Sequence, residues 1–501
     1  MTSTKTPTTS STSTSGHQRA LEWLGTGPKG LLIDGKWVPA VSGKTFETIN
    51  PATEERLALV AEADTADVDA AVGAARRAFE ARSWSAMSPA ARSRLLMKIA
   101  DAVDAHAEEL AVLETLDNGA PLSATRARAT QVAEIFRYYA GWPTKIHGTT
   151  NPTDDSRFLY MLREPMGVCA LINAWNVPLV MAGMKIAPAL ACGNTAILKP
   201  AEQTPLSTLR LAELIEEVGL PPGVLNVLPG YGATAGGAMS AHPGIDKIAF
   251  TGSTMVGRHI LQASAGNMKK VTLELGGKSP NIIFPDANLE VAFKAAAMTF
   301  CRNSGQICSA GTRLFVHESL HEQATEQITR IAATYKVGSP FDADTELGPL
   351  ISQRQMERVL SYVDAGKEDG AHLSMGGSRV GKVGYFVEPT VFSAVGNGMR
   401  IAQEEIFGPV LSIIPFKDEA DAVLKGNDTE YGLAAAVWTR DVSRAHRVAR
   451  ALKSGRVWIN TYAEGDVAMS QGGYKQSGWG REMGAESIEA YTQTKSVLMR
   501  L

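Results

Sequence analysis

From Gly167 onward, the sequence alternates short apolar runs with longer segments whose apolar residues recur at helical spacing. Short runs rich in Val, Ile and Leu are typical of strands buried on both faces, and the longer periodic segments are typical of helices. The expected strands are 168–172, 195–198, 224–228 and 247–250, and the expected helices are 179–191, 205–218 and 254–264. This alternation predicts parallel strands joined by crossover helices, which is the doubly wound α/β arrangement.

A second series of the same kind begins near Pro280. Its expected helices are 289–300 and 320–335, and its strand signals are 313–316 and 410–415. Upstream of both series, residues 32–38 have the pattern of a strand, a turn and a strand. In residues 65–139, Ala, Leu, Glu and Arg recur at helical spacing, which predicts a helix-rich stretch. The change at Gly276-Gly277 therefore predicts a boundary between two α/β units.

Length and charge exclude several classes of protein. The chain has 501 residues, 44% of them hydrophobic, which is more than one ordinary domain needs. Its 49 Lys and Arg against 52 Asp and Glu give a net charge of -3, so nothing favours nucleic acid or an anionic membrane as a partner. The most apolar stretch, 167–191, is interrupted by polar residues and prolines, and no run approaches the ~20 apolar residues that span a bilayer.

Two features indicate a reduced, cytoplasmic protein. The four cysteines form no CxxC pair, and a chain of this length needs no disulfide staples. Residues 1–16 are almost entirely Ser and Thr, without the apolar core of a signal peptide or the repeated arginines of a transit peptide. We expect these residues to form a disordered tail.

Cys308 is the first candidate for chemistry. A thiolate adds to an aldehyde carbonyl, and the resulting thiohemiacetal can pass hydride to a nicotinamide. A lone cysteine is more often a small buried apolar residue, and we interpret Cys169, Cys192 and Cys301 in that way. Cys308 differs because other candidate catalytic residues accompany it in the sequence. The main one is Glu274, which ends an apolar run just before a Gly-Gly turn. Burial there would raise the pKa of the carboxyl and suit it to general-base work, although a surface glutamate is the commoner case.

With these residues in view, the sequence resembles the aldehyde dehydrogenase superfamily from about Leu32 to the C-terminus. Residues 273–278 and 305–308 match the two active-site signatures of that family in order and in spacing. The resemblance implies that Cys308 is the nucleophile, that Glu274 activates water to hydrolyse the thioester, and that Asn176 stabilises the oxyanion. It implies an enzyme that oxidises an aldehyde to a carboxylic acid with NAD(P) and without a metal.

The resemblance also implies which residues contact the cofactor. Lys199 and Glu202 would contact the adenosine ribose, and a carboxylate there favours NAD over NADP because it repels a 2′-phosphate. Ser253, at the start of an expected helix, would serve the pyrophosphate. Glu405 would bind the nicotinamide ribose, and Phe407 would pack beside the nicotinamide. The other implied cofactor-binding residues are Ile172, Trp175, Gly232, Gly252, Gly257, Leu275 and Gln355.

Some positions depart from the family pattern. Ser470-Gln471 stand where Pro-Phe is common, Val177 stands where an aromatic residue is frequent, and Met255 replaces the usual Glu. The first three positions line or adjoin the substrate tunnel in the family, so we expect a roomier or more polar tunnel mouth here. The resulting hypothesis is a bulky or partly polar aldehyde rather than acetaldehyde.

Two alternatives stay open at this point. One is a CoA-acylating aldehyde dehydrogenase, in which CoA instead of water resolves the thioester. Such relatives tend to lack the glutamate at position 274, so Glu274 argues against this alternative. The other is a non-catalytic family member with a structural role, and the intact Cys308, Asn176 and Lys199 argue against it.

The resemblance further implies a domain plan and a homo-oligomer. We expect a Rossmann-type NAD-binding domain from residues 17–142 and 164–277, and an α/β catalytic domain from 278–483. Residues 143–163 and 484–501 would form a small β projection and a C-terminal strand for oligomerisation. An apolar edge such as Val497-Leu498-Met499 needs a partner, so we expect a homodimer or a homotetramer that acts on a small-molecule aldehyde.

Overall fold

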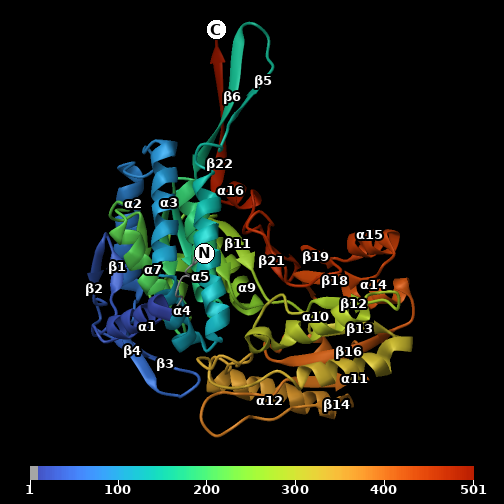
Figure 1. The fold of residues 1–501 in the computed structure, drawn as a ribbon. Helices are drawn as coiled ribbons and strands as arrows, with labels where there is room; N and C mark the ends of the chain where they lie inside the picture. The colour runs from blue at the N-terminus through green and yellow to red at the C-terminus, as the bar shows by residue number, and fades with distance from the viewer. Residues whose placement is uncertain (1–9) are drawn as a thin grey trace, which may run out of the picture.

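The computed structural model describes residues 10–501, which form two α/β units and a long projecting hairpin sheet (Figure 1). The first sheet has eight strands in the order β2-β1-β9-β8-β7-β10-β11-β21. Its strands are β1 (Leu31–Ile33), β2 (Lys36–Val38), β7 (Val168–Ile172), β8 (Thr195–Lys199), β9 (Leu225–Val227), β10 (Lys247–Thr251), β11 (Lys270–Glu274) and β21 (Gly478–Trp479). The five central strands are parallel, and the pairings at both edges are antiparallel. The doubly wound arrangement predicted from the sequence is confirmed.

The strand order places a switch point beside β7. The chain moves from β7 through β8 to β9 and then returns to β10 on the other side of β7. The carboxyl ends of β7, β8, β10 and β11 are Ile172, Lys199, Thr251 and Glu274, and they lie in register with one another or with the adjacent residue. Open parallel sheets bind ligands in the crevice at this point, so the fold itself directs these four residues toward a site.

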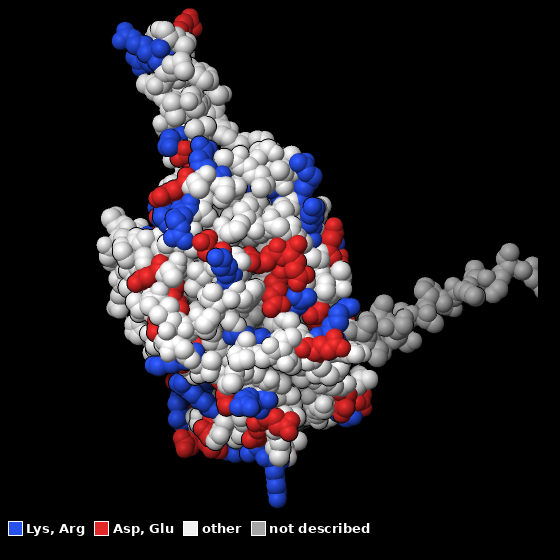
Figure 2. Space-filling model, turned by 90° about the vertical axis from the view of Figure 1, so that its left-hand side faces the viewer, with Lys and Arg blue, Asp and Glu red and all other residues white. Residues whose placement is uncertain are grey.

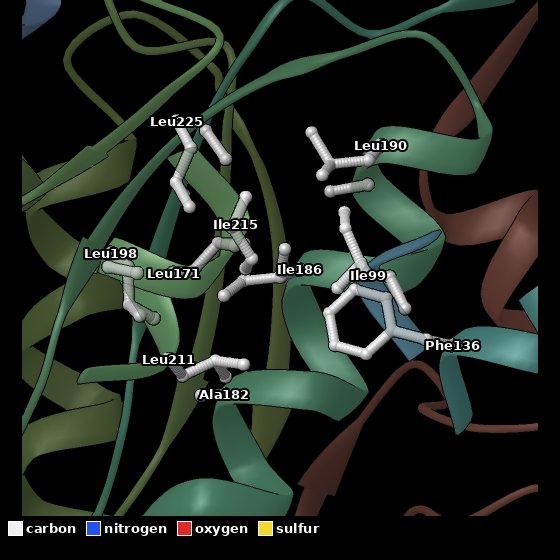
Figure 3. Close-up of a cluster of buried hydrophobic side chains, with 14 of the residues drawn as sticks. Ile99, Phe136, Leu171, Ala182, Ile186, Leu190, Leu198, Leu211, Ile215 and Leu225 are labelled. Atoms are coloured by element: carbon white, nitrogen blue, oxygen red, sulfur yellow. The ribbon is translucent and has the colours of Figure 1, made fainter. Parts of the chain in front are cut away.

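Alternate residues of the central strands point to opposite faces, and helices cover both faces. On one face, side chains such as Leu171 and Leu198 pack against Ile99, Phe136 and Ile186 (Figure 3). These helices are α3 (Pro89–Ala105), α4 (Ala107–Asn118), α5 (Leu122–Ala140), α6 (Pro178–Ala191) and α7 (Leu206–Glu217). The other face packs against α2 (Thr65–Glu80), η1 (Gly232–Gly236), α8 (Gly237–Ala241) and α9 (Thr254–Ser264). Truncating one of these buried leucines to alanine would cost about 2–5 kcal/mol, which makes this core a firm support for the site.

The second sheet has seven strands in the order β14-β15-β16-β13-β12-β18-β19. Its strands are β12 (Pro280–Ile283), β13 (Arg313–His317), β14 (His372–Met375), β15 (Thr390–Ser393), β16 (Val410–Phe416), β18 (Ala434–Trp438) and β19 (Arg456–Ile459). All pairings except β14 with β15 are parallel. The accompanying helices are α10 (Leu289–Cys301), η2 (Arg302–Gly305), η3 (Glu318–Leu320), α11 (His321–Ala332), α12 (Gln353–Glu368), α13 (Arg400–Gln403), α14 (Glu419–Asn427) and α15 (Val442–Ala451).

The strands of the two sheets reach the site with opposite ends. β11 ends at Glu274, and after a short turn β12 begins at Pro280, in register with Arg313 at the start of β13. Cys308 lies in the loop just before β13. The site is therefore bounded by carboxyl ends of the first sheet and by amino ends of the second.

The projection is a three-stranded antiparallel sheet that extends from the molecule (Figure 1). It consists of β5 (Thr149–Asn151), β6 (Arg157–Pro165) and β22 (Thr492–Arg500), which follows α16 (Glu486–Ala490). β22 pairs with β6 along its whole length, from Thr492 with Pro165 to Arg500 with Arg157. Two further two-stranded ribbons are β3 (Thr45–Ile49) with β4 (Arg56–Ala61), and β17 (Tyr431–Gly432) with β20 (Tyr474–Lys475).

Two sequence expectations differ from the structure. The stretch 1–16 was expected to be a disordered tail, but α1 (Ser10–Leu24) begins at Ser10, while residues 1–9 lie outside the described residues. The helix is anchored by tertiary contacts of Ala20 with Val112 and Leu113, which low local propensity does not reveal. The expected catalytic segment 278–483 is also interrupted, because β21 returns to the first sheet and pairs with β11. No helix among residues 10–501 has the length and apolar character needed to cross a membrane.

Candidate active site

A cavity of about 490 Å³ lies where the two sheets meet. A larger one, about 650 Å³, lies at the base of the projection, but it contains none of the predicted chemical groups. The smaller cavity collects residues from both α/β units that are far apart in the sequence. Those predicted from the sequence are Trp175, Asn176, Gly252, Ser253, Glu274, Leu275, Cys308, Gln355, Glu405 and Phe407.

The loop that carries Cys308 has an unusual backbone. Asn303, Ser304 and Gly305 all have positive φ, of 52°, 54° and 72°. A side chain at Gly305 would meet the carbonyl oxygen of Gly408 at 2.0 Å, so only glycine allows this approach. Strain of this kind persists only where the surroundings fix it, and here they hold the loop that presents the thiol.

Gln306 fixes the same loop through its side chain. Its Oε1 accepts a hydrogen bond from the Ile351 N–H at 2.9 Å, and its Nε2 donates to the Asn303 carbonyl at 3.1 Å. The Ser304 hydroxyl donates to the Gly348 carbonyl at 2.7 Å. The sequence singled out this segment for Cys308 alone, and the structure gives Gln306 the separate task of holding the loop.

Asn176 lies directly beside this loop. Its side-chain Nδ2 donates to the Gln306 carbonyl at 2.9 Å, and its Oδ1 is buried without a partner. Asn176 precedes α6, which begins with Pro178, so the fixed start of that helix holds the amide next to the nucleophile loop. The structure therefore brings Asn176 and Cys308 together, as the sequence predicted.

A buried ion pair that sequence reasoning missed connects the Asn176 loop and the nucleophile loop. Arg128 of α5 pairs with Glu114 of α4 at 2.7 Å, and both side chains are buried. The Arg128 Nη2 also donates to the Asn303 Oδ1 at 2.8 Å, and Asn303 Nδ2 donates to the Asn176 carbonyl at 3.1 Å. Asn118 adds a bond from its Nδ2 to the same carbonyl at 3.2 Å. This network fixes the distance between Asn176 and the loop of Cys308.

Glu274 is held very differently. Its side chain is 2% exposed, and neither carboxylate oxygen has a hydrogen-bond partner in the part of the chain that the structure describes. Burial raises the pKa of this carboxyl well above its usual value, and the charge of Glu482 raises it further, while Lys185, Arg481 and Arg456 oppose the rise. A raised pKa makes the ionised carboxylate a stronger base toward a water molecule than an exposed glutamate is.

Lys185 and Glu482 form a second buried ion pair behind Glu274. The Lys185 Nζ lies 2.6 Å and 2.8 Å from the two Glu482 oxygens and donates to the Thr251 hydroxyl at 2.6 Å. Thr251 is in register with Glu274 on the neighbouring strand. The sequence offered one signal for this pair, a single lysine inside the otherwise apolar helix α6.

The thiol of Cys308 is protonated at rest. Burial raises its pKa to about 12, and the nearby carboxylates of Glu405 and Glu274 add to the rise. The Ser309 backbone N–H and the charge of Arg456 act in the opposite direction. Loss of the proton therefore needs a base nearby or a positive charge brought into the cavity.

The Gly276-Gly277 turn allows Glu405 and Cys308 to approach it closely. A side chain at Gly276 would meet the Glu405 Oε2 at 2.3 Å, and one at Gly277 would meet the Cys308 carbonyl oxygen at 2.5 Å. The Gly277 N–H donates to the Glu405 Oε1 at 3.1 Å. Burial raises the pKa of Glu405 to about 7, and this backbone bond and Lys278 oppose the rise. The two glycines thus bring Glu405 and Cys308 to opposite sides of one turn.

The wall opposite the turn has the chemistry of a dinucleotide site. Phe407 and Trp175 meet edge to face with ring centroids 5.2 Å apart, and Gln355 holds the Phe407 carbonyl through a 2.9 Å bond from its Nε2. Ser253 caps α9, whose amino end opens into the cavity and offers N–H groups to a phosphate. These residues fit a nicotinamide dinucleotide, with an apolar wall for the ring and donors for the pyrophosphate.

Five predicted cofactor residues lie outside this cavity, farther along the first sheet. Lys199 ends β8, and its Nζ lies 3.6 Å from Glu202 and donates to the Gly230 carbonyl at 2.6 Å. Ile172 ends β7, and Gly232 begins η1. Gly257 packs against Leu275, since a side chain there would come within 2.8 Å of it. The structure does not bring these residues to Cys308.

The chain matches the aldehyde dehydrogenase family over residues 37–497. It is 50% identical to an aldehyde dehydrogenase of Emericella nidulans over 475 residues, 95% of each chain. It is 49% identical to human retinal dehydrogenase 2, covering 94% of this chain and 92% of that protein. Its fold is also similar to an NAD+ complex of an aldehyde dehydrogenase from Bacillus cereus, with a TM-score of 0.95 and 48% identity over 96% of this chain and 98% of that one.

Proposed function

The chain belongs to the aldehyde dehydrogenase family and oxidises aldehydes to carboxylic acids with NAD, and from that premise we propose how its own residues carry the reaction. Cys308 is the nucleophile, Glu274 is the general base, and Asn176 donates to the oxyanion. The observation that carries this assignment is the buried, unpartnered carboxylate of Glu274 in the same cavity as the Cys308 thiol.

The reaction begins when the Cys308 sulfur, after losing its proton, adds to the aldehyde carbon. The new oxyanion accepts hydrogen bonds from the Asn176 Nδ2 and from the Cys308 backbone N–H. NAD held beside Trp175 and Phe407 would supply the hydride acceptor, and loss of hydride from this carbon would leave a thioester on Cys308. Glu274 then takes a proton from a water molecule, the water oxygen adds to the thioester, and the carboxylic acid departs as the thiol re-forms.

Cofactor binding is assigned by position. Trp175, Phe407, Glu405 and Gln355 would hold the nicotinamide riboside, and Gly252, Ser253 and Leu275 would line the pyrophosphate side. Lys199 and Glu202 would contact the adenosine ribose, next to Ile172, Gly232 and Gly257. The Glu202 carboxylate would repel a 2′-phosphate, which supports NAD in preference to NADP.

Steady-state and single-turnover NADH formation test the catalytic assignment. We expect Cys308→Ala to form no NADH with any aldehyde. We expect Glu274→Gln to form about one equivalent of NADH in a burst and then to turn over about 10²–10⁴-fold more slowly, because hydrolysis has lost its base. Turnover that requires CoA would assign the CoA-acylating reaction instead, and no NADH from the wild-type protein with any aldehyde would favour a structural role.

The proposed substrate is a bulky or partly polar aldehyde. The support is the lack of aromatic side chains at Val177 and at Ser470-Gln471, positions that adjoin the tunnel in the family. Comparison of kcat/KM for acetaldehyde, a long-chain aldehyde and an aromatic aldehyde tests this, and a clear preference for acetaldehyde would contradict it.

We propose that the protein is a cytoplasmic homodimer or homotetramer. All four cysteines are free, which supports a reducing compartment. The middle of the projection carries few charges (Figure 2), and Phe158, Leu162, Leu498 and Met499 are between 39% and 60% exposed there. Such an edge needs a partner strand or face. Sedimentation of the wild type and of Leu498→Asp tests this, because a monomeric wild type would contradict the proposal.

A further inference from the structure

The cavity of about 650 Å³ at the base of the projection takes no part in the proposed reaction. It lies at the amino ends of the parallel strands, next to the starts of β7 and β8, whereas Glu274 ends its strand on the opposite side of the sheet (Figure 1). Helix α6 joins the two regions, since it follows Asn176 and ends next to Cys192, which lines the cavity. A helix of this length spans roughly 20 Å, so the cavity is separate from the reaction centre.

The cavity has the lining of a site for an amphiphilic molecule. Its partly buried apolar side chains include Phe79, Ile146 and Met166, and its uncharged polar ones are Ser85, Thr492 and Gln493. The most deeply buried of its charged residues is Arg92, which is 8% exposed. The cavity therefore offers an apolar surface and a positive charge to the same occupant.

The guanidinium of Arg92, in the first turn of α3, is held in place by the preceding loop. Its Nη1 donates to the Ser85 carbonyl at 3.0 Å and to the Met87 carbonyl at 2.9 Å. The Nε is buried and has no partner among residues 10–501, and Nη2 makes no bond there but is not enclosed. These bonds fix the guanidinium and leave Nη2 open to the cavity.

No anion within residues 10–501 neutralises Arg92. The titratable group that acts on it is the thiol of Cys192, which stays protonated because burial raises its pKa. The other charged residues that line the cavity are Glu80, Arg82, Arg163 and Glu164. Of these, Glu164 already accepts a bond from Lys495 at 2.7 Å. Buried charges in proteins are normally paired, so Arg92 marks a place for an anion that the described chain does not supply.

We propose that this cavity is a second binding site, for an organic monocarboxylate. The carboxylate would accept a hydrogen bond from the Arg92 Nη2, and its apolar body would lie along Phe79, Ile146 and Met166. Bonds between a guanidinium and a carboxylate are charge-assisted, and one negative charge matches one buried cation. A carboxylic acid is also what the reaction releases, so this site would take the same class of molecule as the product of the enzyme.

Equilibrium dialysis of the full-length protein with hexanoate tests the inference. The wild type should bind one equivalent per chain more than Arg92→Met, in which the affinity of the cavity should fall at least about tenfold because a charge-assisted bond is lost. Arg94→Met, which changes an exposed arginine of the same helix, should bind hexanoate as the wild type does. The kcat/KM for aldehydes should be equal in all three proteins, because the cavity is separate from Cys308.

A second variant keeps Arg92 and fills the cavity instead. Ser85→Glu places a carboxylate beside the guanidinium, which already bonds the Ser85 carbonyl, and it should remove the same equivalent of hexanoate. Ala86→Glu, at an exposed neighbour that does not line the cavity, should not. Binding as in the wild type by both Arg92→Met and Ser85→Glu, or equal binding of hexanol, would overturn the inference. Tighter binding of inorganic phosphate than of hexanoate in the cavity would also overturn it, because that result would assign a phosphate site.

Discussion

Cys308 and Glu274 face the same cavity, but the protein holds them in opposite ways. The loop of Cys308 is fixed by side-chain and backbone bonds from Gln306, Ser304 and Asn303, and behind them by the Arg128–Glu114 pair. Glu274 is buried like Gln306, Ser304 and Asn303, yet neither of its oxygens has a hydrogen-bond partner among residues 10–501. The difference matches the proposed tasks, because a nucleophile needs one position, whereas a base must meet water and then release a proton.

The two buried ion pairs near the site act in different ways. The Arg128–Glu114 pair fixes geometry, because Arg128 donates to the Asn303 Oδ1 in the loop of Cys308 and Glu114 accepts from the Leu179 N–H just after Asn176. The Lys185–Glu482 pair lies behind Glu274 and affects its ionisation. The two members of the pair shift the pKa of that carboxyl in opposite directions. A mutation in the first pair should therefore disturb position and stability, and one in Glu274 should disturb chemistry alone.

The largest expected effect is the loss of turnover without loss of stability in Glu274→Gln. The steady-state rate should fall about 10²–10⁴-fold, while the free energy of unfolding should change by less than about 1 kcal/mol, because no existing hydrogen bond is lost. Denaturant unfolding beside the kinetics checks this. A strong loss of stability would show that Glu274 has a structural partner after all.

Arg128→Met should lose much stability and less activity, the reverse of Glu274→Gln. Removing the arginine leaves Glu114 buried without its counter-charge, which typically costs about 3–5 kcal/mol. The kcat should fall about 10–100-fold with little change in KM for NAD, because Asn303 no longer holds the two loops together. Arg128→Met with Glu114→Gln should recover part of the stability but not the kcat. Full recovery of kcat in the double variant would contradict the positioning role.

A smaller effect should appear in the pH dependence of stability through Glu405. Burial raises its pKa to about 7 from the usual 4.5, so the folded state binds this proton more tightly than the unfolded chain does. The resulting stabilisation is complete below pH 4.5 and is lost as the pH rises through about 7. In Glu405→Gln, the loss of unfolding free energy between pH 4.5 and 7.5 should shrink by roughly 1–3 kcal/mol. The exposed neighbour variant Glu404→Gln should leave it unchanged, and an equal change in both variants would contradict the assignment.

The smallest effect concerns the far end of the cofactor site. Glu202→Ser removes the carboxylate beside Lys199 and should raise kcat/KM for NADP about tenfold, because the repulsion of a 2′-phosphate disappears. The burst behaviour with NAD should stay as in the wild type, because Glu202 lies outside the cavity of Cys308 and Glu274. No gain with NADP would remove Glu202 from the ribose assignment.

Much of this arrangement was predictable from sequence, for identifiable reasons. The central strands of the first sheet are short aliphatic runs buried on both faces. Such runs can be recognised from neighbouring residues alone. Glu274 and Cys308 stood out because each sits in a distinctive glycine-containing segment. The close contacts of Gly276 with Glu405 and of Gly277 with Cys308 explain why those segments need glycine.

The supporting residues could not be predicted in the same way. Arg128 and Asn303 are 175 positions apart, and Lys185 and Glu482 are 297 apart. Each looks like an ordinary polar residue until the fold buries it opposite its partner. The helix α1 likewise depends on the packing of Ala20 against α4, which local propensity does not show.

The pairing of β22 with β6 has a consequence for how the protein is made. Lys495 bonds Glu164 across 331 positions, so β6 leaves the ribosome long before the strand that covers its edge. Glu482 and Ser477, which complete the surroundings of Glu274 and Gly276, are made equally late. Throughout most of synthesis, the nascent chain therefore carries a β5–β6 hairpin with an uncovered edge and lacks two residues that surround the reaction centre.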